Sequence, residues 1–205
     1  MRALRAQAGF SLVDILVAIA LIGMVTAMAV PMADSSARSF RMRGDAQSIA
    51  NIVALAKMRA ASRFSRTRIR ADLGANSYRL EVWDKTAARW VTDGDDVLLS
   101  NGVRFGFGGL AQSPPNTQAV IGQSPRCLNQ ATLEDDDGDG AELVDGTACI
   151  VFNSRGVPVD TAGNPMGGNA LYITDGSAVY ATTITATPLV RQWWSNVTAA
   201  AWVRK

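Results

Sequence analysis

The chain has 205 residues and a mass of 21.8 kDa; 48% of its residues are apolar and 19% are charged. This composition excludes a disordered or collagen-like chain, and the length predicts one globular domain with an appendage. A formal net charge of +2 is too small to indicate a polyanionic partner for the chain as a whole. The sequence contains no histidine, which excludes imidazole acid–base catalysis and histidine-containing metal sites.

The chain begins with a short basic segment and a long apolar run. Residues 1–9 are basic and polar, and the run at 10–33 has Asp14 as its one ionisable side chain. Residues 15–33 carry no charge at all. About 20 apolar helical residues cross the hydrocarbon core of a membrane, so this run predicts a transmembrane helix.

The charges around the run predict its orientation. Arg2 and Arg5 precede it, and the positive-inside rule places them in the cytoplasm and everything after Ala33 outside it. The alternative is a secretory signal peptide cleaved at a small residue within 27–33. The run is long for such a peptide, and Asp14 lies near its start.

Asp14 is a candidate functional residue, because a carboxylate inside an apolar helix is costly and usually has a partner. The stretch around it, residues 9–16, reads Gly-Phe-Ser-Leu-Val-Asp-Ile-Leu. This stretch resembles the prepilin-type N-terminal motif of type IV pilins and type II secretion pseudopilins. The resemblance implies that a membrane-bound prepilin peptidase removes the leader 1–9 by cutting after Gly9 and then N-methylates Phe10.

The resemblance also implies a role for the acid in assembly. The carboxylate at the fifth mature position, here Asp14, would counter the terminal ammonium of a neighbouring subunit when both are buried in a filament core. Asp14 stands where the family usually has glutamate, so its reach is one methylene shorter. Pro31 lies where pilin helices commonly carry a kink or a melted segment.

Apolar residues recur with a helical period after the polar residues 34–36. We therefore expect one long helix whose second half, 34–66, is amphipathic and packs on a sheet. The residues of its predicted apolar stripe are Met42, Ala46, Ile49, Ile52, Val53, Ala56, Ala60 and Phe64.

The segment 38–70 is strongly basic, with nine lysine or arginine side chains and Asp45 as its one acid. Such a run is able to follow nucleic-acid phosphates or anionic lipid headgroups. The alternative is a solvated helix face followed by a strand.

The pattern changes to short alternating runs from Asn76 onward. They predict a β-rich globular domain at 67–205, outside the cytoplasm, and hence an α+β protein. The Gly-, Pro-, Gln- and Ser-rich segment 108–126 is predicted to be a loop. The predicted strands are 78–83 paired with 89–91, then 97–99, 103–107 and 150–152, and finally 170–174 paired with 178–184 through a turn at Gly176.

A long N-terminal helix followed by such a β-domain resembles the GspH/FimT/FimU group of pseudopilins and minor pilins. The supporting features are the helix end at 54–59, the hairpin at 78–91, the turn at 152–156 and a late hairpin. The resemblance implies a pilin-like fold and a structural, non-enzymatic subunit at or near the tip of a type II secretion pseudopilus or a type IV pilus. Its partners would be the prepilin peptidase, other pilin subunits and the inner membrane.

Two cysteines, Cys127 and Cys149, lie in the part of the chain predicted to be outside the cytoplasm, where disulfides persist. A disulfide between them is therefore expected, with two free thiols as the alternative. The absence of a Cys-x-x-Cys pair argues against a redox catalyst.

Between the cysteines lies an acidic segment, 134–145, with seven acids and no base. Asp135, Asp137 and Asp139, followed by Gly140, match the start of a calcium-binding loop. Its twelfth position is Gly146 instead of glutamate, so the bidentate ligand is missing unless another acid, Glu142 or Asp145, replaces it. The hypotheses are a Ca²⁺ site and a solvated acidic loop that faces the basic helix end of a neighbouring subunit.

The C-terminal segment 191–205 mixes aromatic and basic side chains. Stacking combined with cations is a way to hold single-stranded nucleic acid. Arg204 and Lys205 are therefore candidate DNA-binding residues, and a DNA-binding minor pilin for natural transformation is the alternative function. The competing interpretation is that Trp193, Trp194 and Trp202 pack on the sheet or line a subunit contact.

Overall fold

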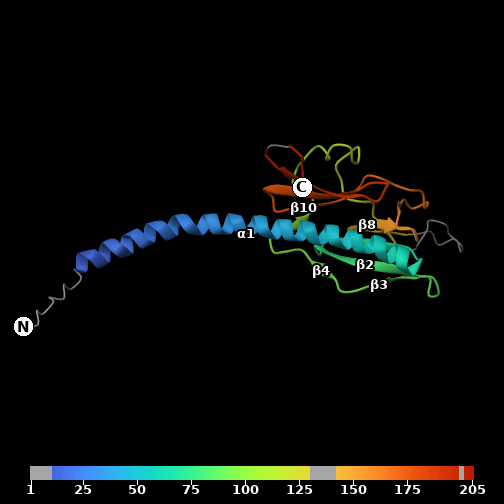
Figure 1. Cartoon of the computed structure of the whole chain (residues 1–205), viewed down its shortest axis with the longest axis horizontal. Coiled ribbons are helices and arrows are strands. Elements are labelled where there is room, and N and C mark those ends of the chain that lie inside the picture. The colour runs from blue at the N-terminus through green and yellow to red at the C-terminus, as the bar shows by residue number, and fades with distance from the viewer. Residues whose placement is uncertain (1–10, 130–141, 199–200) are drawn as a thin grey trace, which may run out of the picture. The chain divides into compact units, whose positions relative to one another are not determined.

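The computed structural model describes residues 11–129, 142–198 and 201–205. In these residues the chain forms one long helix, α1 (Leu12–Arg63), followed by antiparallel β-strands, so the predicted α+β class is confirmed (Figure 1). The chain divides into two compact units, one reaching to Phe40 and one comprising residues 41–205. Helix α1 contributes to both units.

The N-terminal unit exposes an apolar helix. Each large apolar side chain from Leu12 to Met28 is at least 52% exposed. The 18 residues Leu12–Ala29 are long and apolar enough to cross a membrane, and none of this segment is buried. Helix α1 continues through Pro31, so of the kink or melted segment that the resemblance implies there, the melted segment is absent.

The second unit contains two larger antiparallel sheets and a small hairpin. The first sheet has the order β3-β2-β1-β8-β9, and β4 also pairs with β2; the second has the order β13-β12-β11-β10-β5. Strands β6 and β7 form the hairpin. The bounds are β1 Thr67–Asp72, β2 Ser77–Asp84, β3 Arg89–Thr92, β4 Val97–Leu98, β5 Arg104–Phe105, β6 Cys127–Leu128, β7 Leu143–Val144, β8 Thr147–Phe152, β9 Pro158–Val159, β10 Asn169–Thr174, β11 Ala178–Ile184, β12 Val190–Asn196 and β13 Val203–Arg204.

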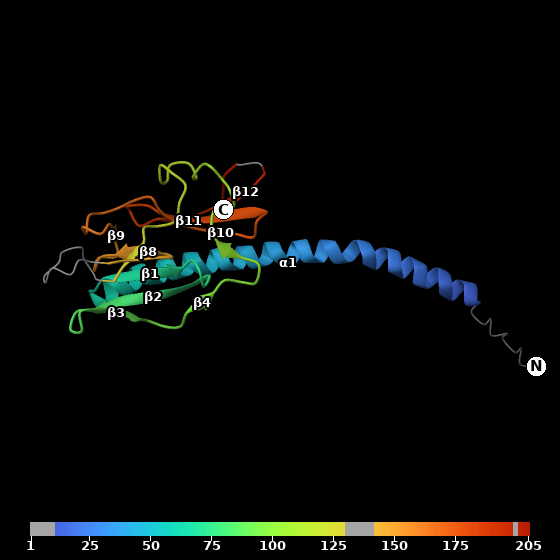
Figure 2. The same ribbon diagram turned by 180° about the vertical axis from the view of Figure 1, so that it is seen from behind.

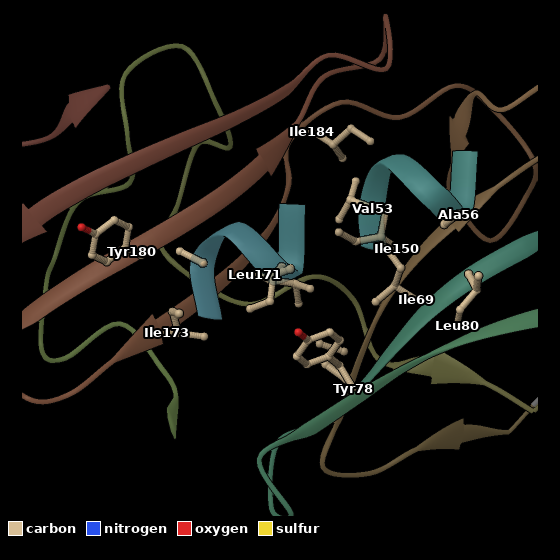
Figure 3. Packing of buried hydrophobic residues seen from close by; sticks show 14 of the residues in the cluster. Val53, Ala56, Ile69, Tyr78, Leu80, Ile150, Leu171, Ile173, Tyr180 and Ile184 are labelled. Carbon is tan, nitrogen blue, oxygen red and sulfur yellow. The ribbon is translucent and has the colours of Figure 1, made fainter. Parts of the chain in front are cut away.

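The main core lies where the second half of α1 meets both sheets, and Figure 3 shows side chains from all three converging there. The first sheet contributes Ile69, Leu80 and Ile150, among others, and the second contributes Leu171 and Ile173. The apolar stripe of the helix is confirmed for six residues that are at most 2% exposed: Met42, Ala46, Ile49, Val53, Ala56 and Ala60.

Hydrogen bonds from both sheets also hold this half of α1. Thr67 Oγ1 in β1 donates to the carbonyl of Ala56 at 2.8 Å, and Gln192 Nε2 in β12 donates to that of Ala46 at 2.7 Å. The carboxylate of Asp45 accepts from the backbone N and the Oγ of Ser100, both at 2.9 Å. The helix is therefore fixed along its length within this unit.

The other face of the second sheet is also covered. The predicted loop at 108–126 contains no helix or strand and packs there in a second core with Tyr172 and Trp193. Gln123 continues the sheet with its side chain: Oε1 accepts from Tyr172 N and Nε2 donates to Tyr172 O, both at 2.9 Å. The 180° view in Figure 2 shows this segment beside β10–β12.

Two features differ from the sequence-based predictions. Helix α1 ends at Arg63 instead of 66, and Phe64 leaves the apolar stripe: its φ is 49° and its side chain is 73% exposed. No strand was predicted within 191–205, whereas β12 and β13 extend the second sheet there.

Candidate functional site

The described part of the N-terminal motif begins at Ser11, which caps α1. Ser11 Oγ accepts a hydrogen bond from Val13 N at 3.3 Å, and Asp14 Oδ2 accepts one from Ser11 N at 3.2 Å. These reciprocal bonds resemble a capping box, in which a side chain three residues after the capping residue accepts a hydrogen bond from the backbone N–H of that residue. Asp14 therefore has a local structural role besides the assembly role that the resemblance implies. The predicted processing residues Gly9 and Phe10 lie outside the described residues.

The predicted disulfide between Cys127 and Cys149 is present. It joins β6 to β8 across a Cα–Cα distance of 4.9 Å, and both residues are buried. Because side chains alternate along a strand and Ala148 and Ile150 face the helix, Cys149 lies on the opposite, outer face of the first sheet. The bond fastens the β6–β7 hairpin to that face.

Part of the basic segment forms a buried ion cluster on the same outer face. Glu81 in β2 is 3% exposed. Its Oε2 lies 2.5 Å from Arg68 Nε, and its Oε1 lies 2.8 Å from Arg79 Nε and 3.9 Å from Arg70 Nη1. Burial lowers the pKa of the Arg68 guanidinium, and Glu81 opposes this shift. The cluster holds β1 and β2 together through their side chains.

Arg68 is also enclosed by two further contacts. Its Nη1 donates to the carbonyl of Leu128, and its Cζ lies 4.2 Å from the centre of the Trp90 ring. On α1, Arg59 and Arg63 pair with Asp93 at 3.2 and 3.1 Å. The segment 38–70 is therefore not one continuous basic surface, because several of its cations have acidic partners within the domain.

A hollow of about 270 Å³ lies beside the disulfide. Its walls include Arg68 and Trp90, together with the apolar side chains of Val151, Val159 and Met166. Because Arg68 is already engaged by Glu81 and Leu128, the hollow offers mainly apolar contact.

The three proposed calcium ligands, Asp135, Asp137 and Asp139, lie outside the described residues. Of the two acids considered as substitutes, Asp145 pairs with Arg126 at 2.6 Å and Glu142 is exposed. Within 11–129, 142–198 and 201–205, no group of three potential metal ligands comes together. The calcium site stays a prediction.

The C-terminal candidates take part in the second sheet. Arg204 lies opposite Trp193 in the β12–β13 pair, and Lys205 Nζ lies 5.4 Å from the centre of the Trp194 ring. Trp202 Nε1 donates to the carbonyl of Gln112 at 2.8 Å. The three C-terminal tryptophans therefore have structural contacts, as the competing interpretation expected, and DNA binding by Arg204 and Lys205 stays a prediction.

A basic hollow at the end of α1 was not predicted. It has a volume of about 490 Å³, and the residues that line it include Arg66, Lys85 and Arg155, together with Phe64 and Trp83. We call it the helix-end pocket. Its cations are 19 and 70 positions apart in the sequence, and the sheet order β2-β1-β8 brings the segments that carry them together. No local spacing could have indicated it.

Comparison with known proteins adds no assignment: no protein-family model matches the chain, and neither a curated protein nor a solved structure matches it.

Proposed function

We propose that this chain is a structural minor subunit of the pilin or pseudopilin class. It is cut after Gly9 by a prepilin peptidase, anchored in the inner membrane by its apolar helix, and incorporated at or near the tip of a type II secretion pseudopilus or a type IV pilus. The observation that carries the proposal is the segment Leu12–Ala29, which is apolar and wholly exposed. Such a surface requires a lipid or protein environment.

The other features agree with this role. The Cys127–Cys149 disulfide suits a domain exported from the reducing cytoplasm. The apolar helix serves first as the membrane anchor and then, after assembly, as part of the filament core. The chain acts without catalysis of its own, because the peptidase and the assembly ATPase supply the chemistry.

Asp14 has two functions in this proposal. One carboxylate oxygen, Oδ2, bonds Ser11 N and caps the helix. In the filament the carboxylate counters the N-methylated ammonium of Phe10 in a neighbouring subunit, so that neither charge is buried alone.

The first test is the intact mass and N-terminal sequence of the membrane-extracted protein, with and without an active prepilin peptidase. The proposal expects a mature chain that begins with N-methylated Phe10 only when the peptidase is active. A chain that begins within 27–33, whether or not the peptidase is active, would identify a secretory signal peptide and refute the proposal.

A second test separates capping from assembly at Asp14. Asp14→Asn retains an oxygen that accepts from Ser11 N but removes the charge, whereas Asp14→Glu retains the charge. We expect Asp14→Asn to abolish incorporation into filaments and Asp14→Glu to preserve it, measured as the amount of subunit in sheared filaments. Ser11→Ala is the capping control. Equal incorporation of Asp14→Asn and the parent would exclude the charge role.

A further inference from the structure

The helix-end pocket displays an aromatic ring on a fixed and strained backbone. Phe64 follows the last residue of α1 and has a φ of 49°, the left-handed region where helices commonly end on glycine. A bulky side chain is unusual there, and such strain often marks functional positions. The ring is 73% exposed, so packing in its own domain does not explain its presence.

Neighbouring strands hold this backbone in place. Lys85 Nζ donates to the carbonyl of Phe64 at 2.8 Å, and Ser65 Oγ donates to that of Trp83 at 2.6 Å. Trp83 N in turn donates to the carbonyl of Arg66 at 2.8 Å. The segment that presents the ring is therefore tied to the end of β2.

The pocket is positively charged. Arg66, Lys85 and Arg155 contribute to its wall, and among the described residues no carboxylate does. Within the part of the chain that the structure describes, neither Lys85 nor Arg155 takes part in an ion pair. Asp84 lies in the adjoining hollow, where its Oδ1 accepts the backbone N–H groups of residues 86 and 87.

Arg155 lies in a hydrogen-bonded turn. Asn153 Oδ1 accepts from the backbone N of Arg155 at 2.9 Å and from that of Val157 at 3.1 Å. The next residue, Gly156, has a φ of 74° and packs so closely on α1 that a Cβ there would lie 3.0 Å from the carbonyl oxygen of Lys57. The cation and the ring are thus both anchored near α1.

We propose that the helix-end pocket binds single-stranded nucleic acid, with Lys85 and Arg155 contacting its phosphates and Phe64 stacking on a base. Cations combined with accessible aromatic faces are the arrangement that holds single strands without sequence preference. The volume of about 490 Å³ falls in the range of small-molecule pockets and suits a nucleotide unit. A duplex keeps its bases stacked on one another, so Phe64 would contribute nothing to duplex binding.

The test uses the full chain in a non-ionic detergent and a fluorescently labelled oligothymidylate, with binding followed by anisotropy at several salt concentrations. Phe64→Gly suits the left-handed backbone and removes the ring; we expect it to weaken binding about tenfold. Arg155→Gln is expected to weaken binding and to reduce the salt slope by about 0.7, the value for one phosphate contact. Near-UV circular dichroism checks that each variant is folded.

Two controls make the assignment specific. Arg104→Gln removes an exposed cation from β5 in the other sheet and is expected to leave binding unchanged. The double variant Arg204→Gln, Lys205→Gln tests the C-terminal segment and is also expected to bind normally. Loss of binding in this double variant, with both pocket variants unaffected, would overturn the proposal.

Three other outcomes would overturn it as well. They are no detectable binding at low salt, duplex bound as tightly as the single strand, and an abasic phosphate oligomer bound as tightly as oligothymidylate. These results do not depend on processing after Gly9, so failure here and failure of the proposed function are distinguishable.

Discussion

Removing the disulfide between Cys127 and Cys149 is expected to destabilise the second unit by about 3 kcal/mol. The two residues are 22 positions apart, and a cross-link that closes a loop of this size removes that much chain entropy from the unfolded state. The second unit comprises residues 41–205, and in a domain of this size each kcal/mol lowers Tm by about 2–4 °C. The double variant Cys127→Ala, Cys149→Ala should therefore melt about 6–12 °C below the parent.

The tryptophans provide a selective probe for this measurement. All five lie between Trp83 and Trp202, so the near-UV circular dichroism of tryptophan reports on the second unit even in the full, detergent-solubilised chain. Three samples are compared: the oxidised parent, the parent with reductant, and the double alanine variant.

The reduced parent and the double variant should melt at similar temperatures, and reductant should not change the variant. A thiol assay confirms complete reduction. If the fully reduced parent melts within about 2 °C of the oxidised parent, the loop-closure argument is wrong for this domain.

Four further predictions concern residues 41–205. In urea unfolding followed by tryptophan fluorescence, Gly44→Ala should raise stability by about 0.5–1 kcal/mol, because Gly44 lies in α1 with open space around it. Gly156→Ala should lower stability by at least about 1 kcal/mol, because the alanine would have to adopt a φ of 74° and its Cβ would lie 3.0 Å from the backbone of α1. A stability change of the same sign in Gly44→Ala and Gly156→Ala would contradict this reasoning. Glu81→Gln should cost about 3 kcal/mol or more in that assay, because it leaves Arg68 buried without its partner; a cost below about 1 kcal/mol would refute a structural role for the pair. Burial raises the pKa of Tyr172 from 10.0 to about 12, so the stability that its neutral form contributes is complete below pH 10 and is lost as the pH rises towards 12. The ultraviolet absorbance of tyrosinate measures this ionisation. A normal titration of all three tyrosines would exclude the raised pKa.

The parts of the fold that the sequence predicted are those with a strong local period. The stripe from Met42 to Ala60 repeats with a helical period, and the hairpin across Gly176 joins two apolar runs. Strand β12 was missed because both faces of its sheet are covered, so apolar and polar residues do not alternate cleanly along it. Strand β1 was anticipated only by the alternative interpretation of the basic segment, a helix followed by a strand; in β1, Ile69 faces the core and Arg68 faces away.

The candidate sites likewise divide into those that local sequence indicates and those that depend on how the strands pair. The N-terminal motif and the disulfide could be predicted because contiguous residues or a pair of cysteines carry them. The Glu81 cluster depends on the register between β1 and β2, which places Arg68 opposite Glu81. The helix-end pocket depends on strand order and on the backbone conformation of Phe64, and neither leaves a signal in residue spacing.

The side chain of Gln123 has a consequence for how copies of this domain can associate. By bonding both the N and the O of Tyr172, it occupies the hydrogen-bonding positions that an incoming strand would need on β10. Strand β5 pairs with β10 only at Ile173 and Thr174. Beyond that pair, Gly106 N also donates to the carbonyl of Tyr172 and Ser124 N donates to that of Ala170, so together with Gln123 they close this part of the edge to β-augmentation. Contacts between copies of this domain at this edge would therefore have to use side chains, and cross-β pairing there is disfavoured.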